Sequence, residues 1–173
     1  MSFTNYSIFQ RRLSSALKKV ERTGADLELR HDRNYYLIGN GGSATIAQHI
    51  AVDMIKGGYS ATAQTDPAVM SMWANDVNWE SAYAGMVAAH IGSNDYLIAI
   101  SSSGESKNII NGCKVAFDRH AHVVTLSGFA ADNTLRIWGE KFGHCNFYVP
   151  SKNYGVVEIA HLAILHAIVN PGT

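Results

Sequence analysis

Short apolar runs that lead through a glycine- or serine-rich turn into a helical pattern recur along this chain. In the first, residues 35–38 are apolar or aromatic, the run ends at Gly39, and helix-like spacing follows over 44–56. Strands that alternate with helices in this way are typical of a parallel sheet covered on both faces. The sequence therefore predicts an α/β fold. The pattern returns at 96–100 before a helical stretch over 108–117, at 122–126, and at 146–149 before a helical stretch over 156–169.

The rest of the chain predicts one domain that begins with a helix. A length of 173 residues suits a single domain, and no repeat or linker divides the chain, so we expect one domain over 1–173. Residues 6–20 carry apolar side chains three and four positions apart, and Gly24 follows as a stop signal. We expect an amphipathic first helix over about 4–22 that takes part in oligomer packing. The segment 59–78 is the least regular and predicts loops near the site.

Composition limits the ligands, the partners and the compartment. The chain is 47% hydrophobic and 16% charged, with a formal net charge of +0. A balance this neutral argues against nucleic acid as the main ligand, and so little charged covering predicts a homo-oligomer. Cys113 and Cys145 lack metal-type spacing, which suits two reduced thiols in a cytoplasmic protein. Because no run of about 18 apolar residues occurs, we expect no membrane association.

Two loops rich in glycine and serine, 39–43 and 101–106, predict a phosphate site. Ligands of open parallel sheets bind at the carboxyl ends of the strands, where both loops fall. Glycines permit close approach, while helix starts and serine hydroxyls supply N–H and O–H donors for an anion. The chain lacks the Gly-Lys-Ser/Thr ending of a nucleotide P-loop and the glycine spacing of a dinucleotide site, so nucleotide binding is the weaker interpretation. The alternative is that these residues only cap helices.

Two groups of residues have spacing suited to chemistry. His49 and Asp53 lie four positions apart on one predicted helix, which places them on one face for joint metal binding or acid–base work. On the last predicted helix, spacing pairs Glu158 with His161, whereas Glu158 and His166 lie about 12 Å apart along the axis. A single histidine in a helix is more often a hydrogen-bonded structural residue than a ligand. We interpret the remaining histidines in this way: His31, His90, His120, His122 and His144.

The segments GNGGSATIAQH and AISSSGESKN resemble the two loops of the sugar isomerase (SIS) domain family. Within that family the chain is most similar to the phosphoheptose isomerases, from the first predicted helix to the last. The resemblance implies a three-layer αβα sandwich of flavodoxin-like type with a five-stranded parallel sheet, and a homotetramer with sites at subunit interfaces. The implied activity is the aldose–ketose isomerisation of sedoheptulose 7-phosphate to D-glycero-D-manno-heptose 7-phosphate, or of a closely related sugar phosphate, for surface polysaccharide heptose synthesis.

The resemblance also implies roles for individual residues. Asp53 and His166 would exchange the protons, and one zinc ion (Zn2+) per site would be held by His49 and His166 with Asp53 and Glu158. His161 would lie behind these ligands. The implied substrate-binding set combines phosphate residues with residues near the sugar hydroxyls: Asn40, Gly41, Gly42, Ser43, Asp76, Ser101, Ser102, Ser103, Ser106 and Glu158.

The chain departs from the family pattern at the predicted site. The family normally has Glu where Asp53 stands, which shortens the reach of the carboxylate, and Gln where Glu158 stands, which adds a negative charge. An acidic residue near Gly155 and an Arg near Gly57 are also replaced. We therefore keep a second hypothesis, a non-catalytic SIS protein that binds a sugar phosphate or a protein partner such as a replication initiator. Retention of His49, Asp53 and both late histidines favours the enzyme.

Overall fold

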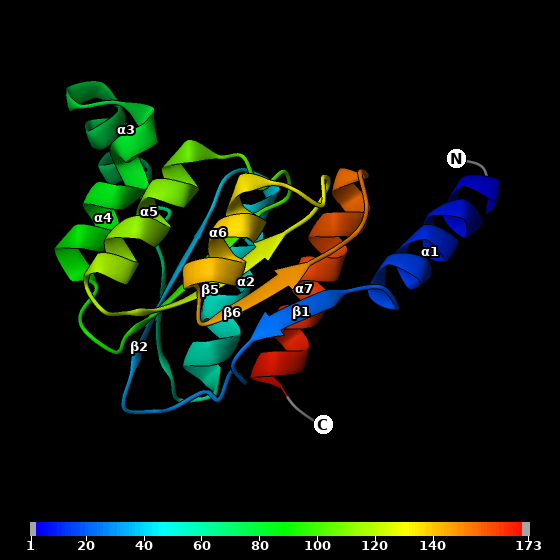
Figure 1. Ribbon diagram of the computed structural model, residues 1–173, viewed down its shortest axis with the longest axis horizontal. Coiled ribbons are helices and arrows are strands. Elements are labelled where there is room, and N and C mark those ends of the chain that lie inside the picture. Colours follow the sequence, from blue (N-terminus) through cyan, green and yellow to red (C-terminus); the bar gives the residue numbers. More distant parts are fainter. Residues whose placement is uncertain (1–2, 171–173) are drawn as a thin grey trace.

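The computed structural model describes residues 3–170, which form one six-stranded sheet with helices on both faces (Figure 1). Within this part of the chain, no helix has both the length and the apolar character needed to cross a membrane. The elements, in chain order, are α1 (Phe3–Leu17), β1 (Glu21–Gly24), β2 (Asn34–Gly39), α2 (Gly42–Lys56), β3 (Ser60–Ala63), α3 (Pro67–Asp76), the 3-10 helix η1 (Trp79–Ser81), α4 (Ala82–His90), β4 (Tyr96–Ser101), α5 (Lys107–Asp118), β5 (His122–Ser127), α6 (Thr134–Phe142), β6 (Cys145–Tyr148) and α7 (Tyr154–Val169).

The strands lie in the order β1-β6-β5-β4-β2-β3 across the sheet. Strands β2 to β6 run parallel, whereas β1 pairs antiparallel with β6, so that Arg22 lies opposite Phe147. The prediction of a wholly parallel sheet of five strands is therefore wrong, because the sheet has six strands and is mixed. All four residues of β1, with the sequence ERTG, are exposed, so no apolar run marks this strand. Its backbone covers the outer edge of β6.

Two further segments differ from what the sequence predicted. The first helix ends at Leu17 rather than near residue 22, and β1 follows it. The segment 59–78, predicted as loops, contains the strand β3 and the ten-residue helix α3, which makes up half of it. The carboxylate of Asp66 caps α3 by accepting from two backbone N–H groups, and Pro67 follows at the first helical position, where a missing N–H costs little. Proline here begins a helix rather than breaking one.

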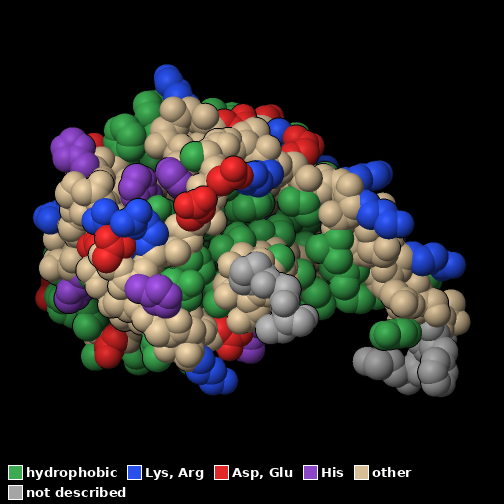
Figure 2. Space-filling view, turned by 90° about the horizontal axis from the view of Figure 1, so that it is seen from below, with side chains coloured by type: hydrophobic (Ala, Val, Ile, Leu, Met, Phe, Trp, Pro, Cys, Tyr) green, Lys and Arg blue, Asp and Glu red, His purple; other side chains and the backbone are tan. Residues whose placement is uncertain are grey.

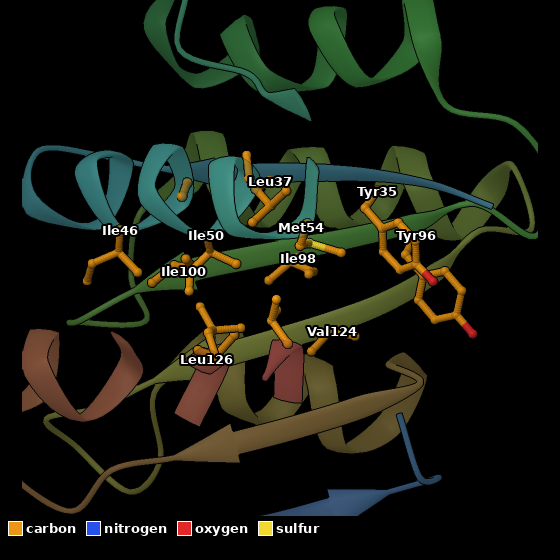
Figure 3. Close-up of a cluster of buried hydrophobic side chains, with 14 of the residues drawn as sticks. Tyr35, Leu37, Ile46, Ile50, Met54, Tyr96, Ile98, Ile100, Val124 and Leu126 are labelled. Carbon is orange, nitrogen blue, oxygen red and sulfur yellow. The ribbon is translucent and has the colours of Figure 1, made fainter. Parts of the chain in front are cut away.

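The core has two halves because alternate strand residues face opposite sides of the sheet. Leu37 and Ile98 pack with Met54 of α2 in one cluster, which also takes in residues of α7 (Figure 3). Their neighbours Ile38 and Leu97 belong to the second cluster, which is built with α4, α5 and α6. Burying each of these side chains stabilises the fold by roughly 1.5–3 kcal/mol. The predicted α/β fold, with helices packed on both faces of the sheet, is therefore confirmed.

Helix α1 extends away from the three layers, and only part of it is anchored (Figure 1). Buried Ala16 joins a third cluster with Val149 and Val156, and Phe9 and Leu13 pack against it. Other apolar side chains of the helix face solvent, since Tyr6 near its start and Leu17 at its end are both exposed. The helix is thus fixed to the start of α7 along one stripe.

Candidate active site

The two loops of glycine and serine meet at the point where the strand order reverses. Strands β2 and β4 are neighbours, but the chain leaves β2 for β3 on one side and continues from β4 to β5 on the other. Open α/β sheets bind their ligands in the crevice beyond the carboxyl ends of two such strands. The loops 39–43 and 101–106 therefore occupy the place where a ligand is expected.

A pocket of about 210 Å³ lies between these loops and the start of α7. It is lined by every predicted substrate-binding residue except Asp76, together with Ile100 and Tyr154. Asp76 is exposed at the end of α3, where its carboxylate accepts from the side-chain amide of Asn75 at 2.9 Å. No Lys or Arg is among the described residues that line the pocket. Its donors are thus hydroxyl, amide and backbone N–H groups.

The first loop is held in position by hydrogen bonds from both sides. Asn40 and Asn108 each donate a side-chain amide to the other's oxygen at 2.9 Å, which ties the first loop to α5. The hydroxyl of Tyr83 donates to the carbonyl of Gly39, and burial raises the pKa of this tyrosine. Gly41, just before α2, has a φ of 52°, a conformation that glycine adopts without the strain of a side chain. The loop is therefore fixed by contacts within the chain itself.

The second loop turns on itself around Gly104, whose φ is 70°. Its N–H lies 3.2 Å from the hydroxyl oxygen of Ser101, and that hydroxyl lies 3.3 Å from the Ser106 oxygen. The hydroxyl of Ser102 differs because it is buried and has no hydrogen-bond partner within residues 3–170. An unsatisfied buried hydroxyl costs about 1–3 kcal/mol, a cost that a bound oxyanion would remove. Ser102 is therefore the clearest mark of a ligand site in this pocket.

Helix α7 closes the pocket with two side chains. The carboxylate of Glu158 lies so close to Gly42 that any larger residue at position 42 would displace it. Tyr154 is 60% exposed, and its ring packs edge to face on Phe129 with 4.7 Å between the centroids. The sequence reading missed Tyr154, since nothing in its spacing separates it from a packing tyrosine. A carboxylate and a phenol thus face the serine hydroxyls across the pocket.

A cluster of His49, Asp53 and His166 forms where α2 packs on α7. The Asp53 Oδ2 atom lies 3.7 Å from His49 Nε2 and 3.3 Å from His166 Nδ1. One potential ligand atom from each residue lies within 4.8 Å of the others. The side chains of His49, Asp53 and His166 are 52%, 20% and 38% exposed, so the cluster is open to solvent on the His49 side. A carboxylate between two imidazoles can move protons or hold a divalent cation.

Two residues of α7 lie apart from this cluster. Glu158, predicted as a fourth metal ligand, faces Gly42 and is not among the described residues whose ligand atoms converge. His161 is fully buried and its Nε2–H donates to the carbonyl of Ser127 at 3.1 Å. Burial lowers the pKa of His161 to about 4, so the ring is neutral near pH 7. Its place is in the core, at the end of β5.

Comparison with known proteins agrees with this geometry. Residues 7–128 match the SIS domain family. Over 147 residues the chain is 33% identical to a phosphoheptose isomerase of Bradyrhizobium sp. (strain BTAi1), an alignment that covers 81% of this chain and 72% of the relative. The chain belongs to the phosphoheptose isomerase family of SIS domains. The resemblance predicted from the two loops is confirmed.

Solved structures of phosphoheptose isomerases extend the match to almost the whole chain. The GmhA structure from Neisseria gonorrhoeae has a TM-score of 0.84 at 25% identity and covers 96% of this chain and 94% of that one. A phosphoheptose isomerase from Francisella tularensis has a TM-score of 0.74 at 25% identity, with 92% and 79% covered. The phosphoheptose isomerase fold is therefore present from α1 to α7.

Proposed function

We propose that this chain is an aldose–ketose isomerase that converts sedoheptulose 7-phosphate to D-glycero-D-manno-heptose 7-phosphate or acts on a closely related sugar phosphate. The observation that carries the proposal is that α2 and α7 each link the serine pocket to the cluster. Ser43 and Glu158 line the pocket, while His49 and His166 lie further along the same helices. The intervals are about 9 Å on α2 and 12 Å on α7. A sugar phosphate of several carbons bridges such a distance.

In this proposal the pocket holds the phosphate and leaves the carbonyl end of the sugar at the cluster. Isomerisation removes a proton from the carbon next to the carbonyl, forms an enediol and returns a proton to the adjacent carbon. Asp53 and His166 are the groups proposed to take and return these protons. The contact between them keeps the imidazole oriented, since the carboxylate lies against Nδ1 and leaves Nε2 free to face a substrate.

We infer that the cluster also holds a zinc ion. Two imidazoles and a carboxylate within 4.8 Å fit the preference of zinc for nitrogen and carboxylate ligands. The family resemblance adds Glu158 as a fourth ligand, which would require its side chain to turn away from Gly42. Zinc bound there would supply a Lewis acid that polarises the carbonyl and hydroxyl oxygens of the substrate. His161 would act only as packing behind α7 in this arrangement.

The proposal includes a cytoplasmic homotetramer with sites at subunit contacts. The two helices that carry the cluster also expose large apolar side chains, Val52 and Ile55 on α2 and Ile159 on α7. Exposed Tyr6 and Leu17 on α1 support a part for this helix in oligomer packing. Large apolar side chains grouped on a surface favour association between chains. Asp76 would approach the sugar hydroxyls as part of this assembled site.

The experiment that tests the proposed function is turnover of sedoheptulose 7-phosphate by the purified protein. The assay is run as purified, with added zinc, and after chelation. We expect product with zinc and a loss of activity after chelation that zinc restores. Absence of turnover in all three conditions, while the protein still binds the sugar phosphate, would favour the non-catalytic binding protein instead.

A further inference from the structure

A groove of about 550 Å³ lies between α1 and the loop that precedes α7, and it is separate from the serine pocket. Four cationic side chains line it: Arg11 and Arg12 from α1, Lys19 from the turn that follows α1, and Lys152 from the loop. Figure 2 shows Lys and Arg side chains along the extended α1. Arg11 and Ser15 lie four residues apart on one face of α1, and Lys19 follows four positions later in the turn after the helix.

These four cations lack the carboxylate partners that would ordinarily balance them. No Asp or Glu is among the described residues that line the groove. None of the ion pairs found within residues 3–170 involves Arg11, Arg12, Lys19 or Lys152. The chain as a whole has 14 basic and 14 acidic residues, so this is a local concentration of charge rather than a general excess. The four positive charges that line the groove repel one another, and a bound anion would offset this repulsion.

We propose that the groove is a binding site for a small molecule with at least two phosphate groups. Guanidinium groups bind phosphate oxygens in pairs, and four cations match the charge of two phosphates. The hydroxyls of Ser15 and Ser151 line the same groove and add neutral donors. A volume of about 550 Å³ exceeds the 210 Å³ of the serine pocket and leaves space for more than one phosphate.

The groove and the serine pocket would bind anions through different interactions. The serine pocket combines neutral donors with the carboxylate of Glu158, whereas all the charged side chains that line the groove are cations. Binding in the groove therefore depends steeply on salt, because each ion pair formed with a phosphate is screened. The two sites are adjacent, since Asn153 lines the groove and Tyr154 lines the pocket at the start of α7. A ligand in the groove thus contacts the segment that positions Tyr154.

Calorimetric titration with inorganic pyrophosphate tests the site in the full chain in its native assembly. We expect one pyrophosphate per chain. Its affinity should fall about tenfold or more as the salt concentration rises from 50 to 200 mM, because salt screens the several ion pairs formed with the phosphates. Lys152→Glu should weaken binding at least tenfold, whereas Lys114→Glu, the same charge change at an exposed site on α5, should not. The double variant Arg11→Gln and Lys19→Gln provides a second test if Lys152→Glu fails to fold.

Two results would overturn the proposal. One is pyrophosphate binding that survives Lys152→Glu but is lost in Ser102→Ala, which would place the anion in the serine pocket. The other is tighter binding of a single-stranded oligonucleotide than of pyrophosphate at 150 mM salt, which would make α1 a surface for polymers. Competition experiments then identify the class of ligand. Displacement of pyrophosphate from the groove by a nucleoside diphosphate or by a sugar bisphosphate supports the proposal.

Discussion

The Nδ1 atom of His166 lies 3.3 Å from Oδ2 of Asp53, although the two residues come from the last and the second helix of the chain. The same oxygen lies 3.7 Å from His49 Nε2. Asp53 therefore stands between two imidazoles and is the least exposed member of the cluster. Any chemistry at this site depends on that carboxylate, either as a proton carrier or as the group that orients the rings.

Removing the proposed proton carriers should abolish turnover and leave phosphate binding intact. We expect Asp53→Asn and His166→Ala each to lower kcat by about 10²–10⁴-fold, the range associated with a positioned acid or base. Inorganic phosphate should bind both variants as it binds the wild type, because the serine pocket is unchanged. His120→Asn, at an exposed position with a φ of 60° that Asn tolerates, is the matched control. Unchanged turnover in His166→Ala would refute its catalytic role.

Ser102→Ala should separate ligand binding from stability. The Ser102 hydroxyl is buried without a partner, so its removal should leave the free energy of unfolding unchanged or raise it by up to about 1 kcal/mol. Phosphate affinity should fall about 10- to 100-fold, because a hydrogen bond to a charged ligand is worth about 1.5–3 kcal/mol. Ser93→Ala is the control, since Ser93 is exposed and does not line the pocket. Chemical denaturation and phosphate titration measure the two effects, and a large loss of stability in Ser102→Ala would contradict this assignment.

Glu158→Gln should distinguish a pocket residue from a metal ligand. In the pocket, the Glu158 carboxylate opposes a bound phosphate, so its neutralisation should tighten inorganic phosphate binding about tenfold, or about 1.4 kcal/mol. If Glu158 instead contributes to the cluster, zinc affinity should fall 10-fold or more in the same variant. Asp53→Asn is the positive control for zinc, because Asp53 lies in the converging set. Phosphate affinity that falls in Glu158→Gln would show that the carboxylate is not a barrier to the anion.

The serine pocket could be predicted from the sequence, whereas the cluster could not be predicted from spacing alone. Glycine and serine loops after buried strands are local features, and parallel strands bring their ends to one edge of a sheet. Joining His49 and Asp53 to His166 requires knowing that α2 packs on α7, which no local pattern states. The family resemblance supplied that contact. Spacing instead paired Glu158 with His161, a residue whose side chain is buried.

The elements that the sequence did not reveal owe their structure to their neighbours. Strand β1 is polar and exposed, and the edge of β6 determines its conformation. Tyr154 is a pocket residue only because Phe129 packs against its ring and α7 begins beside the loops. Long-range contacts of this kind outweigh local preference in short segments, which is why the number of strands and the wall of the pocket were missed.

Buried His161 should make the stability of the protein depend on pH in a defined window. Burial lowers its pKa to about 4, while an unfolded histidine has a pKa of about 6.5, so the unfolded state binds more protons between these values. The contribution of His161 is therefore fully present above about pH 6.5 and is lost as pH falls toward 4, by about 3 kcal/mol in all. His161→Gln keeps a donor for the Ser127 carbonyl but cannot titrate. Urea denaturation at pH 7.5, 6, 5 and 4 should show the wild type losing about 3 kcal/mol relative to this variant. Parallel curves for the two proteins across this window would show that His161 is not held neutral by the fold.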